Sequence, residues 1–224
     1  MITVFIPARG GSKTVPGKNI KEFAAKPLIV HSIEFALQSN LIEEVVVSTD
    51  NSKITRIANS TGARVINRPE ELATDTATTE SAIHHYLNKF SKKPDIVVLL
   101  QATSPLRPKG SLDKALTHFT NGGYDSLLSI SPTHRFFWRV KEDKTSYAEY
   151  DYLNRPRRQD MKPEDMRYVE NGSLYIFTKE HFEKTENRLG GKIGYVEWPE
   201  EYGMEIDTEV DFQCVEKIFK SLNS

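Results

Sequence analysis

The segment VFIPARGGSK, residues 4–13 of this 224-residue chain, is the strongest indication of the fold. In it, a short apolar run leads directly into a loop rich in glycine and cationic residues. The run has the length and β-branched content of a buried strand. Similar runs occur at 45–47 and 96–100. Between the first two, apolar residues at 29, 33, 36 and 37 have the spacing of one helix face.

Strands and helices are expected to alternate along the first hundred residues. We expect further helices at 52–60 and 79–90, and a short strand at 64–66. This alternation predicts an α/β fold with a Rossmann-like, doubly wound and mostly parallel sheet. In such sheets, ligands bind in the loops that follow the carboxyl ends of the strands. The loop at 9–19 follows the first strand and is therefore a candidate site.

The alternating pattern breaks from about 134 to 166. Here FFW at 136–138 is followed by the charged, proline-containing stretch NRPRRQD at 154–160. We interpret this stretch as an insertion within a single domain that spans 1–224. The globular pattern resumes with SLYIF at 173–177, and the chain ends in a predicted helix with one apolar face, formed by Phe212, Val215, Phe219 and Leu222.

Composition narrows the class of partner. The chain has 30 Lys and Arg against 31 Asp and Glu, a net charge of -1, so no basic field favours nucleic acid or an anionic membrane. A single cysteine, Cys214, excludes an intrachain disulfide and a Cys-rich zinc site, which suits a reducing compartment. The apolar start is too short for a signal peptide or a membrane span. We therefore expect a cytoplasmic protein that acts on small molecules.

The loop after the first strand has the features of a phosphate site. Gly10 and Gly11 would let backbone N–H groups approach an anion, while Arg9, Lys13 and Lys18 supply positive charge. The spacing matches neither a Walker loop nor a dinucleotide fingerprint. A solvated turn would explain the composition as well, but the position after the first strand favours phosphate binding.

Two carboxylates at alternate positions, Glu205 and Asp207, form a candidate magnesium site. In an extended segment both side chains point the same way and can share a hard cation with phosphate oxygens. The alternative is purely structural, because Thr208 to Asp211 reads as a capping box and acidic residues stabilise a helix N-terminus without any metal.

Other polar residues are expected at the same edge of the sheet. Gln101 follows the strand at 96–100 directly. Arg68, Asp75 and Thr79 follow the strand at 64–66, where they could contact a base or ribose, although a surface ion pair and helix caps would explain them equally well.

Three arginines in the insertion, Arg155, Arg157 and Arg158, are dense enough to bind a carboxylate or phosphate through paired hydrogen bonds. A solvated charged loop is the alternative interpretation. None of the six histidines has a spacing typical of a metal site.

Taken together, several motifs resemble those of the acylneuraminate cytidylyltransferases. They are IPARGGSK at 6–13, KN at 18–19, LQATSPLR at 100–107, PRRQ at 156–159, ENGS at 170–173 and IDT at 206–208. The resemblance implies a fold of the nucleotide-diphospho-sugar transferase type and a reaction of CTP with an acidic nine-carbon sugar. The anomeric hydroxyl would attack the α-phosphorus and release pyrophosphate, with Mg²⁺ as cofactor and no covalent enzyme intermediate.

The resemblance also implies roles for individual residues. The nucleotide would be held by Arg9, Gly10, Gly11, Ser12, Lys18, Asn19, Arg68, Thr79 and Gln101. The sugar would face Gln101, Arg157 and Tyr175, and the catalytic groups would be Arg157, Arg158, Lys18 and Asp207. Family members commonly have Asp-Ile-Asp where this chain has Glu205-Ile206-Asp207, so Asp207 is the expected direct metal ligand and Glu205 reaches the metal directly or through water.

In the family, the insertion forms a dimer arm that reaches over the partner's active site, so we expect a homodimer with 134–166 as a dimerisation arm. The acceptor within the class stays open, because sialic, legionaminic, pseudaminic and 3-deoxy-manno-octulosonic acids share the carboxylate and anomeric hydroxyl. A glycosyltransferase that consumes a nucleotide sugar, and a binding module without turnover, are the alternatives of another class. The cationic loop favours a triphosphate over a nucleotide sugar, which has fewer charges to neutralise.

Overall fold

The structure, a computed structural model, describes residues 1–90, 93–162 and 165–223. Its main sheet is made of β1 (Ile2–Pro7), β4 (Glu44–Thr49), β5 (Arg64–Asn67), β6 (Ile96–Leu100), β7 (Ser126–Thr133), β10 (Arg167–Thr178) and β11 (Ile193–Glu197). Two small hairpin sheets pair β2 (Glu22–Phe23) with β3 (Lys26–Pro27) and β8 (Trp138–Val140) with β9 (Ser146–Ala148). The helices are α1 (Leu28–Leu37), α2 (Ser52–Thr61), α3 (Thr79–Lys89), α4 (Ser111–Gly122), α5 (Lys179–Thr185) and α6 (Glu209–Leu222).

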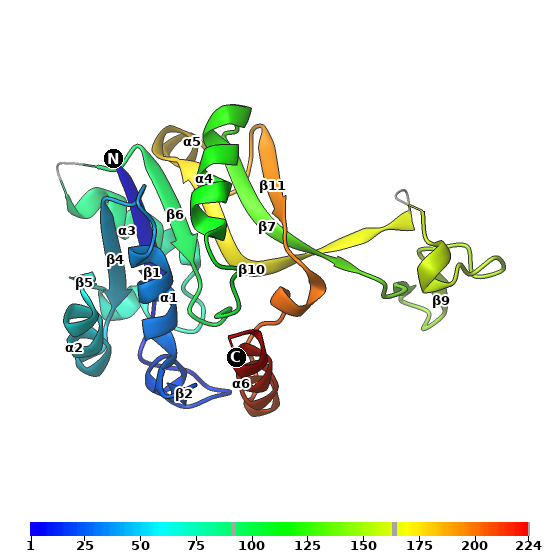
Figure 1. The fold of residues 1–224 in the computed structure, drawn as a ribbon, viewed down its shortest axis with the longest axis horizontal. Coiled ribbons are helices and arrows are strands. Elements are labelled where there is room, and N and C mark those ends of the chain that lie inside the picture. Colours follow the sequence, from blue (N-terminus) through cyan, green and yellow to red (C-terminus); the bar gives the residue numbers. More distant parts are fainter. Residues whose placement is uncertain (91–92, 163–164, 224) are drawn as a thin grey trace.

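The seven-stranded sheet has the order β11-β7-β10-β6-β1-β4-β5 (Figure 1). Strands β5, β4, β1 and β6 pair in parallel, as do β7 and β11, while β10 runs antiparallel to both β6 and β7. The predicted doubly wound, mostly parallel α/β fold is confirmed. The buried runs at 4–6, 45–47 and 96–100 are adjacent central strands because both of their faces are covered.

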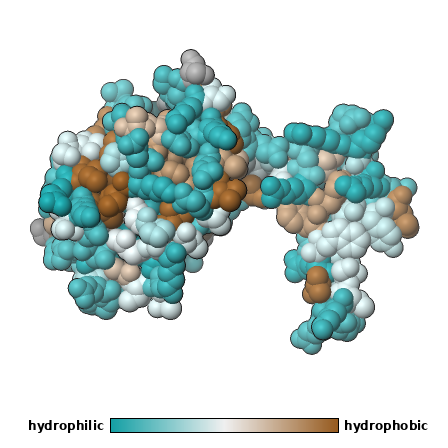
Figure 2. All heavy atoms as spheres, turned by 90° about the horizontal axis from the view of Figure 1, so that it is seen from below, coloured by the Kyte–Doolittle hydropathy of each residue, from teal (hydrophilic) through white to brown (hydrophobic). Residues whose placement is uncertain are grey.

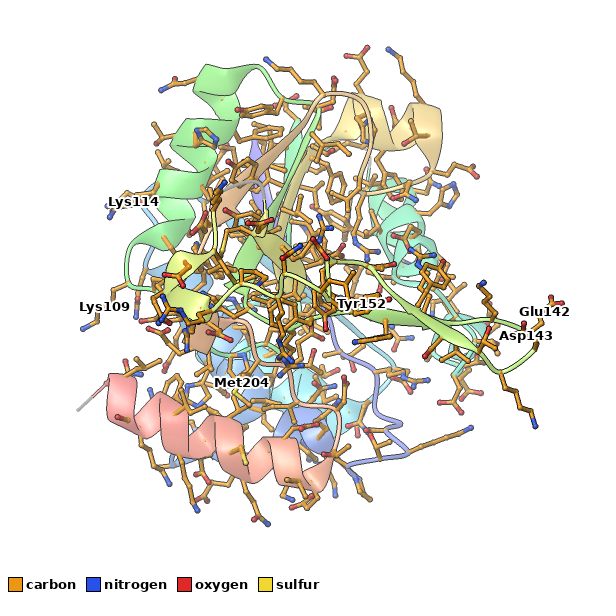
Figure 3. The ribbon with its side chains drawn as sticks, turned by 90° about the vertical axis from the view of Figure 1, so that its right-hand side faces the viewer. Lys109, Lys114, Glu142, Asp143, Tyr152 and Met204 are labelled. Atoms are coloured by element: carbon orange, nitrogen blue, oxygen red, sulfur yellow. The ribbon has the colours of Figure 1, made fainter. Side chains whose placement is uncertain are left out.

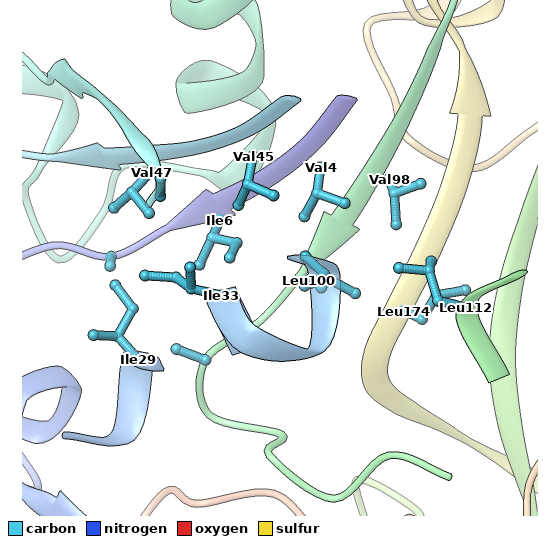
Figure 4. Close-up of a cluster of buried hydrophobic side chains, with 14 of the residues drawn as sticks. Val4, Ile6, Ile29, Ile33, Val45, Val47, Val98, Leu100, Leu112 and Leu174 are labelled. Carbon is cyan, nitrogen blue, oxygen red and sulfur yellow. The ribbon is translucent and has the colours of Figure 1, made fainter. Parts of the chain in front are cut away.

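Helices cover both faces of the sheet. On one face, Val4, Ile6, Val98 and Leu100 pack with side chains of α1, α2 and α4 (Figure 4). On the other face, side chains such as Phe5 pack against α3 and α5. Since alternate residues of a strand point to opposite faces, a continuous apolar run supplies both cores.

A third, smaller core lies beside the loop after β1. It joins Val15 from that loop and Ile206 to Phe212 and Val215 of α6, all buried. The expected C-terminal helix is confirmed, although Leu222 at its end is exposed rather than packed on the shared face. This core fixes the segment 205–207 against the glycine-rich loop.

The residues between β7 and β10 project from the body as an arm (Figures 1 and 2). The arm contains the β8–β9 hairpin, with Glu142 and Asp143 at its outer turn (Figure 3). Positions 163 and 164 of the expected insertion lie outside the described residues. In the part of the chain that the structure describes, no helix has the length and apolarity needed to cross a membrane.

Candidate functional site

A cavity of about 410 Å³ opens where β1, β5 and β6 end, at the edge predicted to bind ligands. We call it the cleft. Most of the residues expected to bind the nucleotide line it, and they come from segments far apart in the sequence: Arg9, Gly11, Ser12, Lys18, Asn19, Arg68, Thr79 and Gln101. Asp207, the expected metal ligand, lines it too.

The loop after β1 is shaped by one hydrogen bond to the end of β4 and one within the loop. The Gly10 N–H donates to Asp50 Oδ1 at 2.8 Å, and Asn19 Nδ2 donates to the Arg9 carbonyl at 3.0 Å. A Cβ atom at Gly10 would overlap the side chain of Asn51, so glycine is required there for close approach. In this structure the Gly10 amide serves Asp50, so Gly10 shapes the loop, while Gly11 and Ser12 line the cleft.

Two cations of this loop share one acidic partner. Arg9 Nη1 lies 2.8 Å from Asp75 Oδ1, and Lys13 Nζ lies 2.6 Å from Asp75 Oδ2. The hydrogen bond from Lys13, with that from Arg9, lowers the pKa of the Asp75 carboxyl, which therefore stays ionised. The expected ion pair of Asp75 is present, and Asp75 also lines the cleft, while its contact with a base or ribose stays a prediction.

Lys18 lies deeper in the cleft, with only 11% of its side chain exposed. Its Nζ donates to the carbonyl of Ile206 at 2.6 Å and is 3.8 Å from Asp207 Oδ1. Burial lowers the pKa of Lys18, and the charges of Asp207 and Glu205 oppose that shift. Lys18 thus brings a positive charge to the two carboxylates expected to bind metal.

The Glu205–Asp207 segment is held by its middle residue. Ile206 is buried and its N–H donates to the Thr103 carbonyl at 2.9 Å. The capping box is present, but the carboxylate that it uses is that of Asp211. The structural alternative therefore accounts for Thr208 and Asp211 and leaves Glu205 and Asp207 for another role.

The donor set suits magnesium bound together with phosphate. Burial, and then the charges of Asp207 and Glu170, raise the pKa of Glu205, so a cation beside it would be favoured. Among the described residues, no group of three or more His, Cys, Asp or Glu side chains could hold a metal. Two carboxylates alone fit Mg²⁺, which commonly takes one or two protein carboxylates and completes its shell with water and phosphate oxygens.

The opposite wall of the cleft is formed by Arg68 and the start of α3. Arg68 Nη2 donates to the Ser48 carbonyl at 2.7 Å, and burial lowers its pKa to about 10. Thr78 caps α3 by accepting a hydrogen bond from the Ser81 N–H, so the first turn of the helix, beginning at Thr79, borders the cleft. A helix N-terminus favours negative charge, which suits a phosphate ligand.

Gln101 is positioned by a residue that sequence reasoning did not single out. The guanidinium of Arg107 donates to the carbonyls of Gln101 at 2.7 Å and Ser173 at 3.2 Å, and to Ser32 Oγ at 2.9 Å. Its burial lowers its pKa to about 9. Arg107 was visible in the 100–107 motif, but only the fold shows that it ties the end of β6 to β10.

A glycine also allows the segments to meet. Gly172 adopts a left-handed conformation, with φ of 61°, where the register of β10 against β7 shifts. A Cβ atom there would overlap the Glu205 carboxylate and approach the amide oxygen of Gln101. Gly172 therefore lets Glu205 and Gln101 lie close together.

Tyr175, expected to face the sugar, lies in the core on the β10 strand. It is buried on the core face with Phe177, and its hydroxyl donates to the Glu170 carboxylate. The Arg188 guanidinium lies 4.6 Å from its ring centroid. Tyr175 does not line the cleft, so in this structure it supports the sheet beneath the site.

The arm arginines are also outside the cleft of their own chain. Arg157 is 74% exposed and pairs with Asp160 three residues later, at 2.5 Å. Arg158 Nη2 lies 3.3 Å from Glu200 Oε2. The structure therefore brings Lys18 and Asp207 together but leaves the other two expected catalytic residues, Arg157 and Arg158, on the arm.

A second cavity of about 560 Å³ adjoins the cleft at the base of the arm. Both cavities share Asp207, and the second is also lined by Glu205, Glu170, Thr133 and Arg135. The two carboxylates of the candidate metal site therefore lie between a cationic cleft and a second space that could receive another substrate.

Comparisons with known proteins identify the family of the chain. A family model described as Cytidylyltransferase matches residues 3–220. The chain is 38% identical over 221 residues to N-acylneuraminate cytidylyltransferase A of Danio rerio, which covers 96% of this chain and 50% of that protein. It is 35% identical over 236 residues to the CMP-N,N'-diacetyllegionaminic acid synthase of Legionella pneumophila, covering 98% of this chain and 96% of that one.

The fold is shared with more distant proteins. The solved structure of CMP:2-keto-3-deoxy-manno-octonic acid synthetase complexed with CTP superposes with a TM-score of 0.73 at 18% identity, covering 99% of both chains. At that identity the similarity shows the fold alone. The chain spans about half the length of the N-acylneuraminate cytidylyltransferases that it matches.

Proposed function

Since this chain belongs to the cytidylyltransferase family, we propose that it transfers CMP from CTP to the anomeric hydroxyl of a sialic-type nonulosonic acid and releases pyrophosphate. The observation that carries the proposal is the convergence of Arg9, Lys18 and Asp207 on one cleft. Cations suited to a triphosphate and a carboxylate suited to magnesium thus lie together at the ligand edge of the sheet.

The chemistry requires positioning and charge neutralisation. The anomeric oxygen forms a bond to the α-phosphorus while the bond from that phosphorus to the pyrophosphate oxygen breaks, and the hydroxyl proton is lost to solvent or a base. Such a displacement is accelerated mainly by holding the reactants in line and stabilising the phosphate oxygens. Lys18 and Arg9 would supply fixed positive charge, and Arg68 and Thr79 would orient the nucleoside.

Glu205 and Asp207 would hold the proposed Mg²⁺. When bound, the ion would neutralise phosphate charge and help to orient the triphosphate. The residues contribute in their own right, because Lys18 lies beside Asp207 and is kept there by the Ile206 carbonyl. The same lysine can therefore contact a phosphate oxygen at the point where the carboxylates meet the cleft.

The proposal includes a homodimer in which each arm serves the partner's site. The arm exposes large apolar side chains, which a contact with another molecule would cover: Trp138, Val140, Tyr152 and Leu153. Figure 2 shows hydrophobic atoms on the surface of the arm, and Figure 3 labels Tyr152 there. Arg157 and Arg158 are on the same arm and do not reach their own cleft. Docking of the arm on a second copy would bury the apolar groups and bring these arginines to the acid sugar.

The acceptor is proposed as a sialic-type acid, with legionaminic, pseudaminic and 3-deoxy-manno-octulosonic acids as the alternative acceptors. The two relatives differ in their named sugars, although they are similarly identical to this chain. A pocket that distinguishes one methyl or hydroxyl group changes few residues, so overall identity does not select the sugar. The proposed compartment is the cytoplasm. The free thiol of Cys214 is exposed, and free thiols persist in a reducing compartment.

Pyrophosphate release tests the reaction and the specificity together. The protein is incubated with CTP, Mg²⁺ and each candidate acid in turn, with reactions lacking acid as the control. We expect pyrophosphate only when all three components are present, and fastest with one sialic-type acid. CTP binding without release for any acid would favour a non-catalytic module, and sugar transfer from a CMP-sugar would favour a glycosyltransferase. Either result would overturn the proposal.

A further inference from the structure

The carboxylate of Asp75 pairs with two cations that line the cleft, Arg9 and Lys13. Asp75 receives Arg9 Nη1 at 2.8 Å on one oxygen and Lys13 Nζ at 2.6 Å on the other. The two cations belong to the loop after β1, whereas Asp75 belongs to the segment between β5 and α3. All three residues line the cleft, so the ion pairs lie at its wall.

The same donors suit phosphate oxygens. Carboxylate and phosphate both present anionic oxygens to guanidinium and ammonium groups at hydrogen-bonding distance. A triphosphate that engages Arg9 and Lys13 would place several negative charges beside the carboxylate of Asp75, and like charges at that separation repel. Asp75 and the phosphates therefore compete for one set of cations.

The competition is reversible because the contacts are weak and local. About 42% of the Asp75 side chain is exposed, and 79% of that of Lys13, so neither ion pair is strongly stabilising. The segment is anchored at both ends, by the buried Arg68 before it and by the Thr78 cap after it. Asp75 can leave its partners without disturbing β5 or α3.

We propose that Asp75 is an exchangeable counterion of the phosphate site: phosphates displace it from Arg9 and Lys13, and its return helps pyrophosphate to leave. This inference rests on the proposed function. It assigns Asp75 to the turnover cycle as a residue that keeps the cationic loop neutralised between substrates and weakens the hold on a phosphate product.

The test compares Asp75→Asn with the parent protein and with Glu71→Gln, which removes an exposed carboxylate from the same segment outside the cleft. Calorimetry measures the binding of pyrophosphate, CTP and cytidine to each protein. We expect Asp75→Asn to bind pyrophosphate and CTP about fivefold tighter, since two weak pairs no longer compete. Cytidine, which has no phosphate, should change less than about twofold, and Glu71→Gln should match the parent.

Equal or weaker pyrophosphate binding by Asp75→Asn would overturn the exchange. Asp75→Glu, which keeps the charge, should restore parental affinity, and its failure to do so would count against a competing carboxylate. A parent protein that binds pyrophosphate but not CTP would refute the proposed function and leave the exchange standing. A parent that binds neither would refute both.

Discussion

The cleft and the arm differ in how their cationic side chains are held. In and beside the cleft, cations are held by groups of the same chain: the Ile206 carbonyl holds Lys18 in the cleft, and the carbonyls of Gln101 and Ser173 hold Arg107 beside it. On the arm, the side chain of Arg157 is 74% exposed and pairs with Asp160, three residues later. Leu153, also on the arm, is 79% exposed. The cleft is complete in outline within one chain, whereas the arm has the character of a surface that another molecule covers.

The cleft and the arm therefore differ in what holds their side chains in place. Positions at the ends of sheet strands are fixed by the core, so the cleft can be preorganised before a ligand binds. None of the described residues of the arm belongs to one of the three cores. We infer that nucleotide binding depends on one chain and that the contribution of the arginines depends on two.

The largest effect is expected from removing the buried cation of the cleft. Lys18→Met keeps the length of the side chain but loses the charge beside Asp207, and kcat/KM for pyrophosphate release should fall by about 100-fold or more. Lys114→Met is the matched control, because Lys114 is exposed on α4 and points away from the body (Figure 3). A Lys18→Met enzyme with more than about a third of parental kcat/KM would break the assignment of the cleft.

A smaller effect is expected from substituting two glycines with left-handed backbone conformations, Gly110 and Gly172. Gly110→Ala adds a Cβ in open space and should cost about 1 kcal/mol of unfolding free energy from backbone strain alone. Gly172→Ala adds the overlap with Glu205 and Gln101, so it should cost about 3 kcal/mol and also reduce turnover. Urea unfolding and the pyrophosphate assay measure both quantities, and equal losses in the two variants would show that Gly172 does not shape the cleft.

The smallest effect concerns the charge of Glu205. Its pKa is raised in the folded chain, so the folded state binds the proton more tightly, and stability is lost as pH rises from the normal glutamate range through the folded pKa. Glu205→Gln should therefore raise the melting temperature of the metal-free protein by about 2 °C at pH 8 and change it little at pH 4. The same variant should need more Mg²⁺ for half-maximal turnover.

Glu201→Gln is the control for this prediction, since Glu201 is exposed on the wall of the second cavity. A lower melting temperature for Glu205→Gln at pH 8 would mean that the ionised carboxylate stabilises the metal-free protein, which would contradict a carboxyl group whose pKa is raised by burial and by neighbouring negative charges.

The sequence predicted the sheet and most of the cleft because both depend on local pattern. Continuous apolar runs identified the central strands, and residues directly after them, such as Arg9 and Gln101, necessarily lie at the ligand edge. Pattern could not show which polar residue is buried. Arg107 and Tyr175 both follow or lie in predicted strands, yet Arg107 holds the Gln101 carbonyl through a hydrogen bond and Tyr175 is a core residue.

Long-range pairing was also beyond the sequence. The contacts of Asp75 with Arg9 and Lys13 join segments about sixty residues apart, and the local pattern of neither segment predicts which residue it contacts. The overlap that requires glycine at 172 arises from Glu205, a residue contributed by a distant loop. The place where Arg157 acts stays a prediction, because one chain does not contain the surface that it would meet.

The most direct test of this division is complementation between a defective cleft and a defective arm. Lys18→Met and Arg157→Ala proteins are each assayed for pyrophosphate release, alone and after unfolding and refolding as an equal mixture. Random pairing in a two-fold dimer gives mixed dimers with one intact cleft facing one intact arm, so the mixture should regain about a quarter of parental activity. A mixture no more active than the separate variants would contradict an arm that serves the partner's cleft.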